Sequence, residues 1–187
     1  MNKIIENIRN RRSVRDFEAK QIDRKILQEI IEAGAYAPSG ANSQPWRFVV
    51  AESEPFRAKL AAMVLPYYKK WIKGMPEEFQ KMREERDLTT PDPVYYGAPA
   101  VVFVIGKGMT SDFDCAMACQ NIMLAARSHW IGSCWVYIGS LVTAEKEIKE
   151  ALELKEGEKV YGPILLGFPK GGFPAAPDRK PLNVKYL

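Results

Sequence analysis

The chain has 187 residues, of which 47% are hydrophobic and 27% are charged, and its net charge at pH 7 is +4. This composition excludes a disordered or collagen-like chain and predicts one domain over residues 1–187, and the charge is lower than dedicated nucleic-acid-binding proteins usually carry. The only histidine, His129, excludes a multi-histidine metal centre within one chain, and three cysteines, an odd number, favour the reducing cytoplasm over a disulfide framework.

No stretch of the sequence is apolar for long enough to cross a bilayer. The residues before Phe17 also lack the apolar core of a secretory signal. We therefore expect a cytoplasmic protein with no membrane partner.

The first predicted elements are two amphipathic helices and a strand. Residues 2–10 place three isoleucines on one face of a short helix. Asp23 is a suitable N-cap for a second helix, which should end near Gly34 because Pro38 follows. The alternating residues 46–52 (WRFVVAE) then indicate a strand.

Residues 66–93 interleave aromatic and basic side chains and contain four prolines. The prolines predict short helices, one or two of them, rather than one long helix. We expect this segment to project from the body as a helical flap.

The second half of the chain alternates strands and helices, which favours an α/β or α+β layered architecture. The β-branched run 101–105 is typical of a strand covered on both faces, and residues 112–130 are the longest helix candidate. The remaining candidates are a strand over 133–136, a helix capped by Thr143 and a strand over 160–168. Pro163 weakens this last strand or places it at a sheet edge, and the proline-rich residues 170–187 should form an extended tail.

An arginine cluster near the amino terminus comprises Arg9, Arg11, Arg12 and Arg15, with Ser13 among them. Guanidinium groups this close repel one another, and a bound phosphate would offset the repulsion because arginine and serine both donate hydrogen bonds to it. A solvated basic face also explains the cluster, and a nucleic-acid backbone site is a third interpretation.

Two further segments combine small, polar and aromatic residues. Residues 37–46 (APSGANSQPW) offer many amide and hydroxyl groups that suit a flat heteroaromatic ligand, although such a loop can simply join a helix to a strand. In residues 130–139 (WIGSCWVYIG), Gly139 would let the main chain approach a planar ring, unless the segment is only a buried strand and turn.

Two patterns that imitate known sites are rejected. Residues 106–111 (GKGMTS) lie between a strand and a helix, as a dinucleotide fingerprint does, but a serine replaces the third glycine and no acid follows about 20 residues later. The three cysteines and His129 lack the paired spacing of structural zinc ligands. We expect the cysteines to pack in the core, and we expect no metal.

Several motifs, taken in order, resemble the nitroreductase family of FMN-dependent oxidoreductases. RRSVRDF at 11–17 is similar to the family's phosphate-binding signature, and residues 37–46 resemble its APSxxNxQPW loop. CQNIMLAA, IGSCW, LLGFP and DRKPL resemble its central helix, the following strand, the final core strand and the tail. Residues 66–93 do not align with the family pattern.

This resemblance implies an α+β sandwich, a mostly antiparallel sheet flanked by helices, in an intertwined homodimer with an extended C-terminal tail. FMN would bind in two sites at the dimer interface, and each site would take residues from both subunits. The implied FMN-binding residues are Arg11, Arg12, Ser13, Arg15 and Arg179 of one subunit, Pro38, Ser39, Asn42 and Gln44 of the other, and Tyr137, Ile138 and Gly139 over one face of the ring.

The implied activity is hydride transfer from NAD(P)H through FMN to a nitroaromatic, quinone or similar electron-poor acceptor. The flavin would carry the redox chemistry, so no catalytic side chain is assigned. From the aromatic and basic composition of the flap, and not from the resemblance, we expect Tyr67, Tyr68 and Trp71 to cover the open flavin face and select the acceptor. Specialised members of the family (dehalogenases, flavin-fragmenting enzymes) and a non-enzymatic protein that binds nucleic acid or another anion stay open as alternatives.

Overall fold

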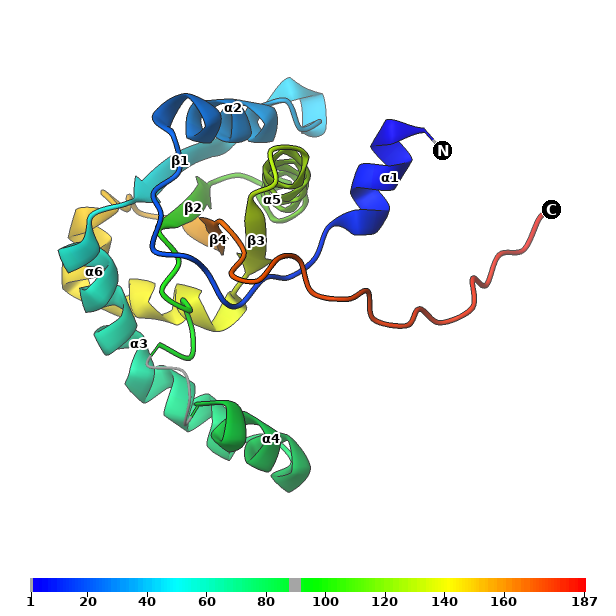
Figure 1. The fold of residues 1–187 in the computed structure, drawn as a ribbon. Coiled ribbons are helices and arrows are strands. Elements are labelled where there is room, and N and C mark those ends of the chain that lie inside the picture. Colours follow the sequence, from blue (N-terminus) through cyan, green and yellow to red (C-terminus); the bar gives the residue numbers. More distant parts are fainter. Residues whose placement is uncertain (1, 88–91) are drawn as a thin grey trace.

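The computed structural model describes residues 2–87 and 92–187, and Figure 1 shows helices on both faces of a central sheet. The strands are β1 (Trp46–Ala51), β2 (Ala100–Gly106), β3 (Gly132–Trp135) and β4 (Lys159–Gly167), in the order β1-β2-β4-β3. All neighbours are antiparallel, with Val49 opposite Phe103 and Cys134 opposite Leu165. The predicted α+β sandwich is confirmed, and the antiparallel pairing gives residues 106–111 no dinucleotide-binding βαβ unit.

The alternation of side chains along the strands divides the core into two layers. Val102 and Val104 of β2 face α2 (Arg24–Ala35) and α5 (Ser111–Ser128). Phe103 faces the opposite layer, which is made by α3 (Glu54–Lys73), the 3₁₀ segment η2 (Tyr137–Ala144) and α6 (Lys146–Ala151). All of β2 is buried, as predicted for a strand covered on both faces.

Both N-terminal helices begin where the sequence predicts. α1 (Lys3–Asn10) and α2 follow Asn2 and Asp23, whose side chains each accept a hydrogen bond of 2.8 Å from a first-turn amide. α2 buries Leu27 and Ile30 against the sheet, whereas no residue of α1 is buried. α1 therefore presents its isoleucine face to the outside of the chain.

The helical region after β1 differs from the prediction. α3 (Glu54–Lys73), not α5, is the longest helix, and it continues through Pro66. Its buried residues, Leu60, Val64, Tyr68 and Ile72, recur every four positions and pack on the core. Packing along this whole face compensates for the hydrogen bond that the proline removes, and the proline itself is exposed.

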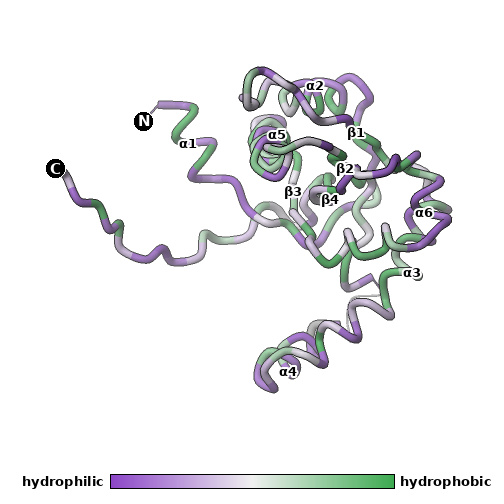
Figure 2. The backbone as a smooth tube through the Cα atoms, turned by 180° about the vertical axis from the view of Figure 1, so that it is seen from behind, coloured by the Kyte–Doolittle hydropathy of each residue, from purple (hydrophilic) through white to green (hydrophobic). Residues whose placement is uncertain are grey.

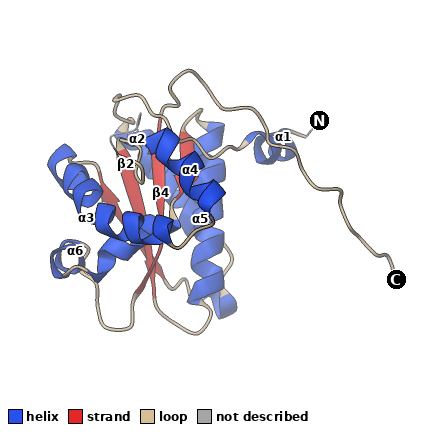
Figure 3. Cartoon of the chain, turned by 90° about the horizontal axis from the view of Figure 1, so that it is seen from below, coloured by secondary structure: helices blue, strands red, loops and turns tan. Residues whose placement is uncertain are grey.

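α4 (Glu77–Asp87) packs on the end of α3, and Figure 1 shows both projecting from the sandwich. Figure 3, seen from below, draws α4 in front of the sheet. Trp71 of α3 meets Phe79 of α4 edge to face at 5.7 Å between ring centroids. Residues 88–91 of the predicted flap lie outside the described residues.

Two smaller predictions about the second half need correction. β4 is an interior strand and not an edge strand. Pro163 does interrupt its ladder: it occupies a bulge opposite Phe103, where the ladder needs no amide from it. Thr143 is not a helix cap: it lies inside η2 (Tyr137–Ala144), and Glu145 precedes α6 (Lys146–Ala151). The Thr143 hydroxyl donates to Ser140 O at 2.7 Å instead.

Beyond Phe173 the chain forms no helix or strand and runs away from the sandwich on the side where α1 lies (Figures 1 and 2). Its last residues, among them Leu182 and Tyr186, are exposed. Among the described residues, no helix combines the length and the hydrophobicity that a bilayer span requires.

Candidate functional site

Both ends of the chain meet at a cavity of about 430 Å³. Four lining residues come from the segment after α1 and four from the tail: Arg11, Arg12, Ser13 and Arg15, and Pro174, Ala175, Pro177 and Arg179. We call this cavity the arginine pocket. It unites all five FMN-binding residues that the sequence assigns to one subunit, and none of the eight lining residues is acidic.

Main-chain hydrogen bonds hold the two segments in place. Val14 N donates to Ser133 O of β3 at 2.9 Å, and Lys170 N donates to Asp16 O at 3.1 Å. Gly132 permits this approach, because a Cβ there would lie 2.8 Å from Val14 Cγ2. The pocket is therefore built on β3, although its lining residues lie outside the sheet.

The electrostatics of the pocket favour an anion. Burial lowers the pKa of Arg11, and the nearby charges of Arg179 and Arg12 lower it further. Like charges that disfavour one another in this way would all be stabilised by one negative group between them. Arginine suits such a role because its planar donors match the oxygens of a phosphate.

Arg12 has a second task. One of its terminal nitrogens donates to Arg9 O at 2.6 Å and to Arg11 O at 2.8 Å, so its guanidinium group satisfies carbonyls at the end of α1. Its Nε is buried and has no hydrogen-bond partner among the described residues. Such an unsatisfied donor is costly, and an oxyanion in the pocket is one acceptor that could offset the loss.

The loop between α2 and β1 is exposed and internally ordered. Asn42 and Gln44 have left-handed φ values of 55° and 43°. The Gln44 amide donates to Ser39 Oγ at 3.0 Å, and its side chain donates to Asn42 Oδ1 at 3.1 Å. Pro38 precedes them and is also exposed. These hydrogen bonds link Ser39, Asn42 and Gln44, so three of the four predicted loop residues are held together.

Within a single chain, this loop and the arginine pocket lie near opposite ends of α5. Gly40 N in the loop donates to Asp114 Oδ1 in the first turn of α5. The segment that leads into the pocket contacts the other end of α5, where Asn7 donates to Leu124 O and Arg127 donates to Asn10 O. At the helical rise per residue, these contacts lie roughly 15–20 Å apart along α5.

The segment after β3 is more buried than the sequence indicates. Ile138 is buried, and only the Tyr137 side chain extends into solvent. Gly139 does allow a close approach, but the nearby ring belongs to Tyr95: a Cβ on Gly139 would lie 3.0 Å from Tyr95 Cε1. The Tyr95 hydroxyl also donates to Gly139 O at 2.8 Å.

The three aromatic flap residues have different surroundings. The Tyr67 hydroxyl donates to Glu145, which fastens α3 to the start of α6. Tyr68 belongs to the core, bonds to Asp87 and Arg83, and has its pKa raised by burial to about 12. Trp71 is half-buried and packs against α4. Tyr68 therefore anchors α4 to α3.

The cysteines lie in the core, as the sequence predicts. Burial raises the pKa values of Cys115 and Cys119 to about 12, which keeps both thiols protonated at neutral pH. His129 lies 3.2 Å from a Glu29 oxygen near the surface. Within 2–87 and 92–187, no three His, Cys, Asp or Glu side chains are grouped closely enough to hold a metal.

Comparison with known protein families identifies the family of this chain. The model of the family described as "Nitroreductase family" matches residues 8–168. This chain belongs to the nitroreductase family.

Three relatives of this nitroreductase-family chain span most of its length. A protein of Archaeoglobus fulgidus, provisionally named an NADH dehydrogenase/NAD(P)H nitroreductase, is 29% identical over 177 residues, which cover 91% of this chain and 87% of that protein. 4-Nitrobenzoate reductase of Pseudomonas putida is 25% identical over 190 residues, and the match covers 86% of this chain and 83% of that protein. A Bacteroides fragilis nitroreductase, whose crystal structure contains bound FMN, is 30% identical in sequence to this chain. The two structures match with a TM-score of 0.80 over 100% of both chains.

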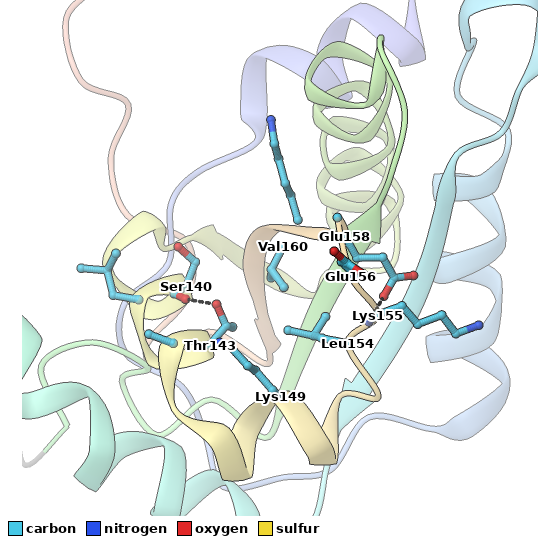
Figure 4. A pocket seen from close by; sticks show the side chains of 12 residues that line it. Ser140, Thr143, Lys149, Leu154, Lys155, Glu156, Glu158 and Val160 are labelled. Atoms are coloured by element: carbon cyan, nitrogen blue, oxygen red, sulfur yellow. Dashed lines mark hydrogen bonds between the residues drawn. The ribbon is translucent and has the colours of Figure 1, made fainter.

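The nitroreductase-family motifs contain five of the eight residues that line the arginine pocket, and the other three were not predicted. Pro174, Ala175 and Pro177 carry no charged or hydrogen-bonding side chain, so only their closeness to Arg179 in the sequence could have indicated them. A second cavity of about 570 Å³ lies between η2, α6 and the start of β4 (Figure 4). No predicted site residue lines this cavity. Lys155 lies on the side opposite Ser140 and Thr143, and its side chain points away from them.

Proposed function

We propose that this nitroreductase-family protein binds FMN and passes hydride from NAD(P)H to an electron-poor small molecule such as a nitroaromatic or a quinone. The observation that carries the proposal is the arginine pocket, where guanidinium groups from both ends of the chain surround a cavity with no acidic residue. A related nitroreductase, 30% identical, was crystallised with FMN, and another relative is a 4-nitrobenzoate reductase.

The pocket residues fit the phosphate end of FMN. Arg11 and Arg179 would donate charge-assisted hydrogen bonds to the phosphate, and the Ser13 hydroxyl would add another. The lowered pKa of Arg11 supports this assignment, because a phosphate would relieve the repulsion from Arg179 and Arg12. Arg12 would contribute its unpartnered Nε while it continues to cap α1.

The ring end of FMN would need a second subunit. The loop with Pro38, Ser39, Asn42 and Gln44 lies near the opposite end of α5, so a partner's copy must supply it if pocket and loop act on one ligand. The exposed isoleucines of α1 and the exposed apolar end of the tail support a homodimer, since isolated chains rarely expose so many large apolar side chains together.

Bound FMN would supply the two-electron chemistry, and the protein's own groups would bind, orient and shield it. Arg15, at the rim of the positive pocket, would stabilise negative charge on the pyrimidine side of the ring. Tyr137 is free to contact one face, since its side chain is exposed beside buried Ile138 and Gly139. For the selection of the acceptor, Trp71 of the flap is our candidate.

The direct test is an absorbance spectrum of the purified protein. We expect a yellow protein whose flavin absorbance is bleached by NADH or NADPH without oxygen and recovers when a nitroaromatic or quinone is added. A colourless protein that does not bind added FMN would contradict the proposal. Binding of a nucleic acid to such a protein would instead favour a non-enzymatic role for the arginine cluster.

A further inference from the structure

Arg127, near the end of α5, holds together three segments that are distant in sequence. Its Nε donates to Asn10 O at 3.1 Å. Its guanidinium carbon lies 4.7 Å from the ring centroid of Trp130 and 4.3 Å from that of Phe173. The two rings are 6.1 Å apart and inclined by 60°, so the guanidinium group contacts both aromatic faces.

These contacts lie directly beside both walls of the arginine pocket. Asn10 immediately precedes Arg11, and Phe173 immediately precedes Pro174, the first tail residue that lines the pocket. Arg127 itself does not line the pocket. It is therefore placed to fix the spacing of the two walls without contacting whatever lies between them.

Trp130 supplies a second, independent observation. It lies just after the end of α5 with a φ of 59°, in the left-handed region where glycine or asparagine is usually found, and 67% of its side chain is exposed. Backbone strain and exposure both disfavour a tryptophan at this position. Its contact with Arg127 and Phe173 accounts for a tryptophan here.

Among the described residues, Arg127 contacts aromatic rings and a carbonyl group and not a carboxylate. No ion pair between Arg127 and a carboxylate occurs among the described residues, so its planar group is committed to the two rings and to Asn10. A lysine would keep the charge but lose the planar stacking and the Nε donor. This difference separates an electrostatic role from a geometric one.

We propose that Arg127, Trp130 and Phe173 form a latch that orders the base of the tail and so positions Arg179 for the FMN phosphate. The inference rests on the proposed function, because it assumes that FMN occupies the arginine pocket. Arg127 and Trp130 are positioning residues in this account, and Arg179 makes the contact. Opening the latch should release the tail and weaken FMN binding even though no pocket residue is changed.

The first experiment compares FMN affinity, by flavin fluorescence titration of the apoprotein, in Arg127→Lys, Trp130→Gly and Trp130→Phe. We expect the first two to weaken affinity by roughly 3- to 30-fold and Trp130→Phe to stay near wild type. Trp130→Gly also relieves the backbone strain, so its melting temperature should be unchanged or higher. Arg24→Gln, which removes an exposed arginine from the start of α2, is the control and should bind FMN normally.

The second experiment is a double-mutant cycle with Arg179→Ala. If the latch acts through Arg179, Arg127→Lys should have little further effect once Arg179 is gone. Effects on FMN affinity that simply add would overturn the proposal, as would unchanged affinity in both Arg127→Lys and Trp130→Gly.

A third measurement needs no FMN. Trypsin should cleave the apoprotein after Lys170 or Arg179 several-fold faster in Trp130→Gly than in wild type, as followed by mass spectrometry. Equal cleavage rates would overturn the latch. If the wild-type protein does not bind FMN at all, the proposed function fails, whereas the cleavage rates still decide whether the latch orders the tail.

Discussion

Arg11 and Arg12 are neighbours of the same type, yet they have different surroundings. Arg11 faces Arg179 across the pocket, and burial together with that charge lowers its pKa. Arg12 donates two hydrogen bonds to carbonyl oxygens at the end of α1. The sequence assigns both to phosphate binding, because a motif cannot show which guanidinium group is already bonded to the backbone.

We predict that Arg11→Ala weakens FMN binding by about 1.5–3 kcal/mol, since it removes a charge-assisted hydrogen bond to the phosphate. This corresponds to a dissociation constant raised roughly ten- to 150-fold in a fluorescence titration. Lys25→Ala, on the exposed start of α2, serves as the control. A dissociation constant that stays at the wild-type value would argue against the phosphate assignment.

At Gly139 the main chain comes close to an aromatic ring of its own chain, and the expected approach to a flavin ring stays a prediction. The sequence indicates a close approach of the main chain to an aromatic ring, and the ring found there is Tyr95 of the same chain. No sequence pattern links these two positions, because β2, α5 and β3 lie between them along the chain.

Gly139→Ala should therefore destabilise the fold by about 1–3 kcal/mol through overpacking against Tyr95 and Pro163. Urea denaturation measures this change. Gly74→Ala is the matched control, because a Cβ there meets only the Trp71 carbonyl at 3.5 Å. Equal stability of the two variants would show that the Tyr95 contact relaxes freely.

At the scale of elements, Arg47 and Glu158 join β1 to the turn before β4. The two Arg47 nitrogens that face Glu158 lie 2.7 and 3.0 Å from its oxygens. These hydrogen bonds lower the pKa of Glu158 to about 2. A carboxylate with a lowered pKa stabilises the folded state above its unfolded pKa, and that stability is lost as the pH falls toward the folded pKa.

Glu158→Gln should thus lower the melting temperature at pH 7, and the difference from wild type should shrink as the pH falls from about 4.5 to 2. Thermal denaturation across this range gives the result. Glu78→Gln, on an exposed position of α4, should show no such trend. A constant difference between wild type and Glu158→Gln at every pH would contradict the assigned pKa.

The flap illustrates where local sequence rules fail. Four prolines predict short helices, but the apolar spacing of α3 extends that helix through Pro66. Tyr68 and Ile72, inside the predicted flap, belong to the core. Propensity describes a local preference, and burial of a long helix face outweighs it here.

Trp71 is the flap residue best placed to affect the acceptor, because Tyr68 is buried and Tyr67 is bonded to Glu145. We expect Trp71→Leu to change kcat/KM for nitroaromatic acceptors by roughly 2- to 10-fold, the range of one aromatic contact, with FMN affinity unchanged. Trp71→Phe should retain most of the wild-type value. Identical acceptor kinetics in Trp71→Leu and wild type would remove the flap from acceptor selection.

At the scale of the whole molecule, the order of motifs predicts the family and the sandwich, because those motifs mark its strands, its central helix and its loops. The convergence of residues 11–15 with residue 179 follows from that family resemblance alone, and β3 and the tail base bring it about in the fold. The latch around Arg127 has no signature in the sequence, since it joins three unrelated segments.

The isoleucines of α1 offer a test of the dimer. Ile4 is 68% exposed in one chain, so Ile4→Glu should scarcely affect an isolated chain but should weaken an interface that covers it. We expect a shift from dimer to monomer in sedimentation equilibrium and a parallel loss of FMN. Lys3→Gln, on the same helix, changes the net charge by the same one unit and serves as the control. An unchanged molar mass would show that α1 lies outside the interface.

The most direct measurement for the whole account is a crystal structure of the protein with FMN. We predict the phosphate within hydrogen-bond distance of Arg11 and Arg179 of one subunit, with the ring against residues 38–44 of the other. A monomer, or FMN bound away from the arginine pocket, would contradict the central claim that the two ends of one chain together hold the phosphate.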